Sequence, residues 1–417
     1  MRRNTRAFLF IFALLMVLTP AFPVLAAAQE ILKVGSQGGR VTELQIALRN
    51  AGFFPASQKA TGYYGWITYG AVTALEKKHG LKVDGQVGDQ EWQVLYSGKA
   101  SSKVVLGYYT VDYPGDKLSY NALANANRMI NQVAMFDYGI DARGNLKGGI
   151  SPEGLKLARN KGAGTLMVVH NISSGTFDRQ SCISVITNSE SRSRLINNIV
   201  GQLDKGGYNG VNIDFEGLPA YCRDEYNAFL EQLGGKLKAK GKLLTVAIPA
   251  KTSDSGNSWS AAYDYKTIGR LADYVVIMAY DEHWSGGPAG PVASAPWVEQ
   301  VIKYAGGVVP AQKILLGLGS YGYDWPAWQK GKTVKWKDVP KLVSQSGGVV
   351  QWSNTYSVPY LNYTKSGVKH QVWFENKYSL GIKLNLAKKY GLGGVAMWRL
   401  GYEDASFWET VEKHFWD

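Results

Sequence analysis

The sequence predicts an α/β protein in which a (β/α)8 TIM barrel follows a small three-helix domain. Three observations lead to this prediction. The chain has 417 residues, which exceeds what a single hydrophobic core usually holds. Short apolar runs alternate with amphipathic helical stretches from residue 104 onward, whereas residues 31–97 show helical periodicity and glycine turns. With 45% hydrophobic and 19% charged residues, the composition excludes a disordered chain and a polytopic membrane protein.

The first segment, residues 1–28, has the order of a secretory signal peptide. Arg2, Arg3 and Arg6 precede an apolar run, and small residues follow up to Ala28. The run is too short to span a bilayer comfortably, so we expect cleavage near Ala28, with a retained N-terminal anchor as the alternative. We therefore expect a secreted protein without stable membrane insertion. Because no cysteine follows the run, we also expect no lipid anchor.

Charge and rare residue types limit the partners and cofactors. The chain has 46 Lys and Arg against 33 Asp and Glu, and its formal charge of +13 becomes +10 without the three signal arginines. An exported basic protein attracts anionic cell-wall polymers and carboxylate-bearing peptides. The sequence has no run rich in lysine and arginine, so we expect no nucleic-acid partner. Five His and two Cys at wide spacings predict no metal site, and we expect no other cofactor.

The small domain is predicted to span residues 29–98. Apolar stripes predict its three helices, over residues 41–51, 68–79 and 89–95. Gly-Tyr-Tyr-Gly at 62–65 and Leu-Lys-Val-Asp-Gly-Gln-Val-Gly at 81–88 stand between them. This order resembles the peptidoglycan-binding type 1 domain, and the resemblance implies binding to peptidoglycan glycan strands. A packing unit without a ligand is the alternative.

A short flexible linker is predicted at residues 99–103, before a barrel that spans 104–417. Eight apolar runs predict the barrel strands, at residues 104–109, 132–136, 165–170, 210–215, 243–248, 274–279, 314–318 and 394–398. Strands that are buried on both faces and separated by helices favour a closed barrel over an open doubly wound sheet. The stretch 325–390 is too long for one loop. Strand-like runs within it predict an α+β insertion between strands seven and eight, beside the barrel mouth.

The fourth predicted strand carries the residues on which the functional prediction depends. It ends in Asn-Ile-Asp-Phe-Glu at 212–216. Because side chains alternate along a strand, Asn212, Asp214 and Glu216 point to one face and their apolar neighbours point to the helices. Reactive groups of such barrels lie at the carboxyl ends of the strands. Two inward carboxylates cost stability unless they have partners, so we interpret them as a site, with surface carboxylates as the structural alternative.

Three motifs resemble those of glycoside hydrolase family 18. The sequence 209–216, Asn-Gly-Val-Asn-Ile-Asp-Phe-Glu, resembles the family signature Asp-Gly-x-Asp-x-Asp-x-Glu, and Met-Ala-Tyr-Asp at 278–281 matches its Met-x-Tyr-Asp. Trp398 closes the eighth strand, where the family keeps a tryptophan. Tyr-Gly-Tyr-Asp-Trp at 321–325 and Val-Trp-Phe-Glu at 372–375 resemble most the bacterial spore cortex-lytic N-acetylglucosaminidases.

The resemblance implies substrate-assisted catalysis with retention, in which the 2-acetamido oxygen of the substrate attacks the anomeric carbon. Glu216 would act as acid and then base, and Asp214 would orient the acetamido N–H and raise the pKa of Glu216. Tyr280 would donate to the acetamido carbonyl, with a hydrogen bond to the backbone as its structural alternative. Barrel filling is the alternative for the methionine and the tryptophan of these motifs. The predicted substrate-binding residues are Asn212, Met278, Asp281, Trp398, Tyr108 and Tyr323.

Two departures from the family pattern concern Asn209 and Asn212, which stand where the signature has Asp. An amide at position 212 can donate a hydrogen bond that keeps Asp214 ionised, so we expect activity with a shifted pH profile. Cys182 and Cys222 follow strands three and four. In an exported chain they could form a disulfide, or they could remain free, because the sequence does not give the distance between them.

The sequence therefore predicts a secreted hydrolase, associated with the cell wall or the spore, that cleaves β-1,4 bonds after N-acetylglucosamine in peptidoglycan. A muramic residue would then lie on the leaving side. A chitinase with the same mechanism is the first alternative, and a catalytically inactive protein that binds glycan or chitin is the second. A monomer is expected.

Overall fold

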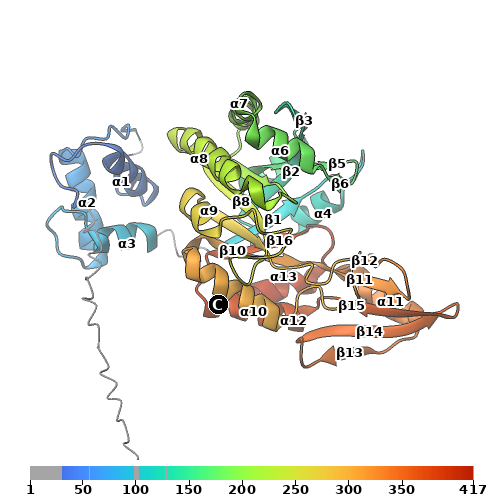
Figure 1. The fold of residues 1–417 in the computed structure, drawn as a ribbon. Helices are drawn as coiled ribbons and strands as arrows, with labels where there is room; N and C mark the ends of the chain where they lie inside the picture. The colour runs from blue at the N-terminus through green and yellow to red at the C-terminus, as the bar shows by residue number, and fades with distance from the viewer. Residues whose placement is uncertain (1–30, 56, 98–102, 127–128, 417) are drawn as a thin grey trace, which may run out of the picture. The chain divides into compact units, whose positions relative to one another are not determined.

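The computed structural model describes residues 31–55, 57–97, 103–126 and 129–416. The predicted signal peptide and residues 99–102 of the predicted linker lie outside the described residues. The chain divides into two compact units, residues 1–101 and 102–417 (Figure 1). Within the four described ranges, no helix combines the length and the apolar character that crossing a bilayer requires.

The smaller unit contains three helices around one core, which confirms the predicted three-helix domain. The helices are α1 (Gly39–Asn50), α2 (Trp66–His79) and α3 (Asp89–Ser97). Its core consists of apolar side chains that are almost fully buried, among them Leu32, Val41, Leu44, Leu48, Tyr64, Val72, Leu75 and Val87. The apolar stripes from which the helices were predicted are therefore the residues that form this core.

The turn after α2 depends on Gly85. Its φ of +66° lies in the left-handed region, and a Cβ atom there would approach the Tyr69 ring to 2.1 Å. The Gly85 amide donates to both carboxylate oxygens of Glu76 at 3.0 and 3.1 Å, and its carbonyl accepts from the Tyr64 hydroxyl at 2.8 Å. The turn at the Asp-Gly pair of the sequence motif therefore requires glycine at position 85.

The larger unit is a closed barrel of eight parallel strands, as predicted. The strands are β1 (Val104–Tyr109), β2 (Gln132–Ile140), β4 (Gly164–His170), β7 (Gly210–Asp214), β8 (Leu243–Pro249), β9 (Tyr274–Met278), β10 (Ile314–Gly319) and β16 (Gly394–Trp398). β1 pairs in parallel with both β2 and β16, and this double pairing closes the sheet (Figure 1). A short strand, β3 (Leu146–Gly148), pairs with the end of β2 in the antiparallel direction.

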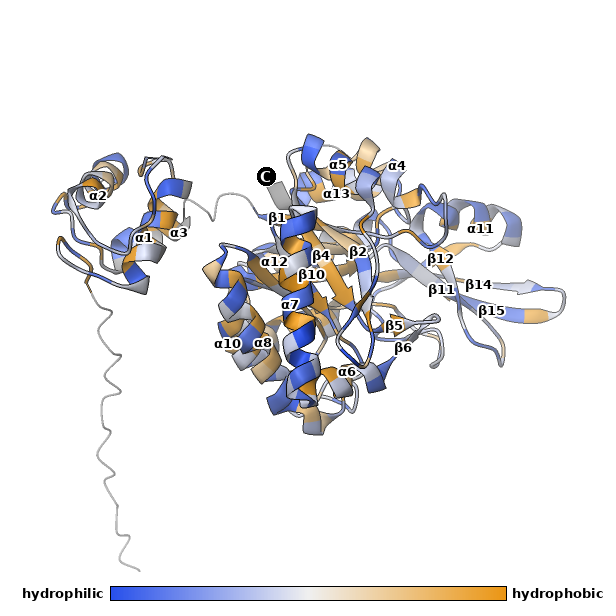
Figure 2. Cartoon of the chain, turned by 90° about the horizontal axis from the view of Figure 1, so that it is seen from above, coloured by the Kyte–Doolittle hydropathy of each residue, from blue (hydrophilic) through white to orange (hydrophobic). Residues whose placement is uncertain are grey.

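Helices surround the barrel, and Figure 2 shows apolar strands inside helices with polar outer faces. The helices are α4 (Leu118–Asn125), α5 (Pro152–Asn160), α6 (Arg179–Thr187), α7 (Ser189–Gly206), α8 (Arg223–Ala239), α9 (Tyr265–Leu271), α10 (Ala295–Val308), α12 (Lys377–Lys389) and α13 (Ala405–Val411). Val211, Ile213 and Phe215 are fully buried in the layer between strands and helices. The alternation predicted for this strand therefore holds, and the residues between them face the barrel interior.

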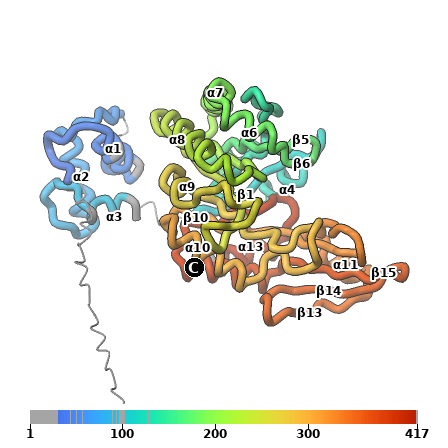
Figure 3. The backbone as a smooth tube through the Cα atoms, viewed as in Figure 1, coloured from blue at the N-terminus to red at the C-terminus, as the bar shows by residue number. Residues whose placement is uncertain are grey.

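An insertion between β10 and α12 forms a five-stranded antiparallel sheet with one helix, and Figure 3 shows it extending from one side of the barrel. It contains β11 (Tyr321–Pro326), β12 (Lys332–Lys335), α11 (Val339–Ser346), β13 (Val350–Ser353), β14 (Val358–Lys365) and β15 (Val368–Trp373). The insertion begins at Tyr321 and not at the predicted residue 325. Only Ser320 separates β10 from β11, so the sequence has no turn signal at this boundary.

Candidate active site

Strand β7 carries the predicted carboxylates to the carboxyl end of the barrel. Asn212 is fully buried and Asp214 is only 6% exposed. Glu216 is half-buried and lies just beyond the end of the strand. The three residues share the inner face because the residues between them pack outward. Exposure increases from Asn212 to Glu216, so Glu216 is the more accessible of the two carboxylates.

The backbone at Glu216 is held by side chains from other parts of the barrel. Asn171 donates from Nδ2 to the Glu216 carbonyl at 2.9 Å and accepts from the Glu216 amide at 2.9 Å. The Tyr263 hydroxyl donates to the Phe215 carbonyl at 2.6 Å. Because β7 ends at Asp214, these backbone groups have left the strand ladder and need other partners. The two side chains therefore position Glu216.

Burial perturbs the acidity of both carboxyl groups. It raises the pKa of Asp214 to about 7, and Asp214 Oδ1 is buried without a hydrogen-bond partner among the described residues. The pKa of Glu216 is raised well above its usual range by burial and then by the charge of Asp214, while a hydrogen bond from Trp259 opposes the shift. Both causes favour the protonated form of Glu216, which is the form that a general acid requires.

Asn212 makes different contacts from those expected. Its Nδ2 donates to Thr245 Oγ1 at 2.8 Å, and its Oδ1 accepts from the Tyr108 hydroxyl at 3.2 Å. The Thr245 hydroxyl donates in turn to the Val211 carbonyl at 3.0 Å, so it is an acceptor toward Asn212. The expected hydrogen bond from Asn212 to Asp214 is not formed, because the amide is directed at the neighbouring strand β8.

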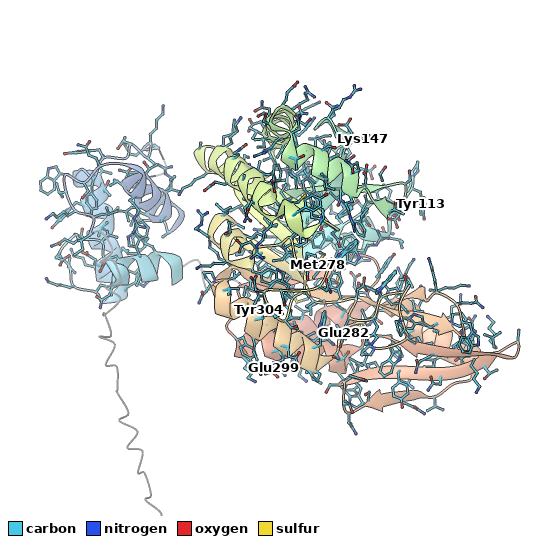
Figure 4. All side chains as sticks on the ribbon, in the orientation of Figure 1. Tyr113, Lys147, Met278, Glu282, Glu299 and Tyr304 are labelled. Atoms are coloured by element: carbon cyan, nitrogen blue, oxygen red, sulfur yellow. The ribbon has the colours of Figure 1, made fainter. Side chains whose placement is uncertain are left out.

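The end of β9 supplies the next predicted residues. Met278 is 9% exposed at the end of the strand, where Figure 4 labels it, and Tyr280 is half-buried beyond it. Burial raises the pKa of Tyr280 well above its usual range, so its hydroxyl stays protonated and can donate. Asp281 Oδ1 accepts from the hydroxyls of Tyr321 at 2.6 Å and Tyr323 at 2.9 Å. Asp281 thus links this loop to the first strand of the insertion.

Aromatic rings form the remainder of the barrel mouth. Trp398 makes edge contacts with Tyr108 and Phe136, at centroid distances of 5.4 and 5.3 Å, and Phe136 stacks on His170 at 4.3 Å. Burial lowers the pKa of His170 to about 4, and its Nδ1 accepts the Ile172 amide at 3.0 Å, so the imidazole is neutral. The half-buried Trp398 offers a broad apolar face to a sugar ring.

The structure brings most of the predicted site residues together at one end of the barrel. Tyr108 is only 2% exposed and its hydroxyl is bonded to Asn212, while the Tyr323 hydroxyl is bonded to Asp281. These two tyrosines lie beneath the surface of the mouth, and their direct contact with substrate stays a prediction. Cys182 and Cys222 are buried, free cysteines in the structure, and the predicted disulfide is not present in it.

Five further residues of the site were not predicted from the sequence, namely Asn171, His170, Phe136, Trp259 and Tyr263. The first three follow or end predicted strands at their carboxyl ends, and this position was the available signal. The other two lie on the long loop between β8 and α9, where no motif marks them.

Comparison with known families agrees with this geometry. Residues 153–403 match the family described as glycosyl hydrolases family 18. The chain belongs to this family. Residues 37–95 match a peptidoglycan binding domain, so this family 18 glycoside hydrolase also carries a binding domain in its smaller unit.

Individual relatives of the family 18 chain include proteins named as cortex-lytic enzymes and a chitinase. The cortical fragment-lytic enzyme of Bacillus anthracis is 30% identical over 307 residues, which are 70% of this chain and 71% of that protein. The crystal structure of the Bacillus cereus spore cortex-lytic enzyme SleL matches with a TM-score of 0.71 and 28% identity, over 75% of this chain and 74% of that one. The chitinase of Chromobacterium violaceum matches with a TM-score of 0.71 and 32% identity, over 75% of this chain and 98% of that one.

Proposed function

We propose that this family 18 enzyme is a secreted peptidoglycan hydrolase that cleaves the β-1,4 bond after N-acetylglucosamine and acts on spore cortex or cell wall. The observation that carries the proposal is the combination of the Asp214 and Glu216 pair with a peptidoglycan binding domain in one chain. The similarity to proteins named as cortex-lytic supports the same substrate. The expected charge of +10 after removal of the signal peptide favours association with anionic wall polymers.

The proposed mechanism follows from the positions of the carboxylates. Asp214 ends β7 and Glu216 follows two residues later on the same inner face, so they approach a glycosidic bond from one side and Asp214 cannot attack from the opposite side. In the first step the 2-acetamido oxygen bonds to the anomeric carbon while Glu216 protonates the leaving oxygen, and the glycosidic bond breaks. This step gives an oxazolinium ion. In the second step Glu216 takes a proton from water while the water oxygen bonds to the anomeric carbon and the bond from the acetamido oxygen breaks, which gives net retention of configuration.

Asp214 and Tyr280 would act on the attacking acetamido group. Asp214 accepts its N–H, and the Tyr280 hydroxyl donates to its carbonyl oxygen. The unpartnered Oδ1 of Asp214 and the protonated state of Tyr280 agree with these roles. Only a sugar with a 2-acetamido group can assist its own hydrolysis in this way, so the mechanism itself limits the sugar before the cleaved bond.

The smaller unit would hold the enzyme on its polymer. We propose residues 29–98 as the binding domain, 99–103 as the linker and 104–417 as the catalytic domain. Tyr63, Trp66 and Ile67 are exposed at the beginning of α2 and give the smaller unit an apolar surface for a sugar ring. Attachment to the polymer raises the effective concentration of glycan at the barrel, without requiring an oligomer.

A chitinase is the second candidate, because the chitinase of Chromobacterium violaceum matches the same barrel with a TM-score of 0.71. Incubation of the full chain with purified cortex, vegetative sacculi and chitin distinguishes the candidates. Mass analysis of the products should show muropeptides that end in reducing N-acetylglucosamine. Products from chitin alone would contradict the peptidoglycan assignment.

The Glu216→Gln variant tests the assigned acid. It should lose at least about 10²-fold in kcat because the amide cannot transfer the proton. Glu190→Gln, at an exposed position in α7, is the matched control and should keep full activity. Unchanged turnover in Glu216→Gln would show that the catalytic acid is another residue. An inactive wild-type chain that still binds glycan would support the alternative of a binding protein.

A further inference from the structure

A pocket of about 900 Å³ lies on the insertion, away from Asp214 and Glu216. Its walls come from the loop between β9 and α10, the turn between β11 and β12, and the outer parts of β14 and β15. Its lining includes Trp325, Trp328, Lys330, Lys369 and Gln371. The proposed mechanism leaves this pocket without a role.

A row of aromatic side chains connects the barrel mouth to the pocket wall along one face of the insertion sheet. Tyr280 contacts Tyr321 at a centroid distance of 6.2 Å, Tyr321 contacts Tyr323 at 5.4 Å, and Tyr323 contacts Trp325 at 5.3 Å. Alternate residues of β11 thus form an aromatic row from the catalytic tyrosine to the pocket wall. Gln371 lies opposite Trp325 in the sheet and therefore shares this face. At about 3.4 Å per residue, Trp325 lies about 14 Å beyond Tyr321.

The opposite wall is a loop with a closed base. The Glu282 carboxylate accepts from the Ser294 amide at 2.7 Å and from the Ser294 hydroxyl at 3.0 Å, and the Glu282 amide donates to the Val292 carbonyl at 2.9 Å. Figure 4 labels Glu282 at the start of this loop. The Gly331 amide donates to the Ser285 carbonyl at 2.7 Å and joins the loop to the turn after β11. The pocket is therefore formed before a ligand binds.

Charge and amide groups indicate the ligand class. Two exposed lysines, Lys330 and Lys369, line the pocket, and the imidazole Nδ1 of His370 lies 2.8 Å from Asp324 Oδ1. Among the described lining residues no carboxylate is present. Gln329, Gln371 and Asn362 add side-chain amides, which can donate to and accept from peptide groups. A peptide with free carboxylates fits these groups, whereas a neutral sugar leaves both lysines without a counter-charge.

Trp328 is a further sign of a binding role. Its side chain is fully exposed at the pocket, and its φ of +66° lies in the left-handed region, which non-glycine residues rarely adopt. The exposed ring offers an apolar surface beside the lysines. It can cover the methylene or methyl groups of a bound peptide.

We infer that this pocket binds the carboxylate-bearing peptide stem of a peptidoglycan strand whose glycan lies in the barrel mouth. The inference rests on the proposed function, because it needs a substrate that carries stems. An extended peptide spans at most about 3.3–3.6 Å per residue, so about four residues cover the distance from Tyr321 to Trp325. The pocket thus adds recognition of the stem to recognition of the sugar, and it distinguishes peptidoglycan from chitin, which has no carboxylates.

The test compares two soluble substrates with the full chain. One is a set of glycan oligomers with intact stems, and the other is the same oligomers after an amidase has removed the stems. The double variant Lys330→Gln and Lys369→Gln should raise KM for the stem-bearing oligomers three- to tenfold, leave kcat unchanged, and leave both constants unchanged for the stripped oligomers. Lys365→Gln, at the end of β14 outside the pocket lining, is the matched control and should change neither constant.

The outcomes separate this inference from the proposed function. An unchanged KM in the double variant, or an equal change for both substrates, would overturn the stem site while leaving peptidoglycan hydrolysis intact. A wild-type chain that cleaves neither substrate would contradict the proposed function. In that case titration of free stem peptide into the full chain still decides the question, since weaker binding by the double variant supports the pocket and no binding by the wild type overturns it.

Discussion

Replacement of Asn171 by alanine tests whether the position of the catalytic acid is set by its backbone. The variant removes two hydrogen bonds of 2.9 Å from a residue that is 1% exposed, and it leaves the amide and carbonyl of Glu216 without these partners. A buried polar group without a partner costs about 1–1.5 kcal/mol in such cases, so we expect a loss of about 2–3 kcal/mol in the free energy of unfolding. For a domain of this size, that loss lowers Tm by about 3–5 °C.

The same change should slow catalysis. A displacement of about 1 Å at a catalytic group costs about 10²-fold in rate. If the Glu216 carboxyl group moves by this amount, it can no longer transfer its proton efficiently to the oxygen of the leaving group. Trp398 and Tyr280 are unaffected, so KM should change by less than about threefold. The measurement is kcat and KM on soluble glycan oligomers, together with thermal unfolding of the same preparation.

Asn160→Ala, at the exposed end of α5, is the control for loss of an asparagine side chain and should change neither Tm nor kcat. A kcat within twofold of wild type in Asn171→Ala would refute the positioning role. A loss that appears only in KM would place Asn171 in substrate binding instead.

Three further predictions concern the buried groups of the barrel. The pKa of Asp214 is raised to about 7 in the folded state, so ionisation of this carboxyl group favours the unfolded chain above about pH 4. Asp214→Asn should therefore abolish activity but raise the free energy of unfolding at pH 8 by up to about 4 kcal/mol. Urea unfolding should show this gain at pH 8 and no gain at about pH 4. A destabilised Asp214→Asn at pH 8 would contradict this sign. Asn212→Asp adds a second buried acid and should move the acidic limb of the kcat profile to higher pH, and an unchanged profile would count against the assigned site. Cys182 and Cys222 are buried, free cysteines, so a non-reduced digest should contain two free thiols, and one disulfide-linked peptide would contradict this.

The barrel strands were predictable because burial on both faces leaves continuous apolar runs. The catalytic strand was predictable for a different reason. Its polar and apolar residues alternate, and its polar residues reach the carboxyl end of the barrel, where the active sites of such barrels lie. The family motifs then assigned chemistry to Asp214, Glu216 and Tyr280 that spacing alone does not give.

The supporting contacts were not predictable, because they join residues that are distant in the sequence. Asn171 and Glu216 are 45 positions apart, and their hydrogen bonds exist only once β4 and β7 are paired. The predicted hydrogen-bond partner of the Asn212 amide was also wrong, because the observed partner, Thr245, comes from a third strand. Side-chain geometry at strand ends is fixed by tertiary structure and leaves no periodic signal in the sequence.

The pairing of β1 with β16 has a consequence for when the enzyme can work. The two strands lie about 290 positions apart, and the tryptophan platform of the mouth ends the later one. A nascent or truncated polypeptide that lacks β16 has neither a closed barrel nor the tryptophan on which the sugar ring would pack. Hydrolytic capacity therefore arises only after nearly all of the catalytic domain has been synthesised and folded.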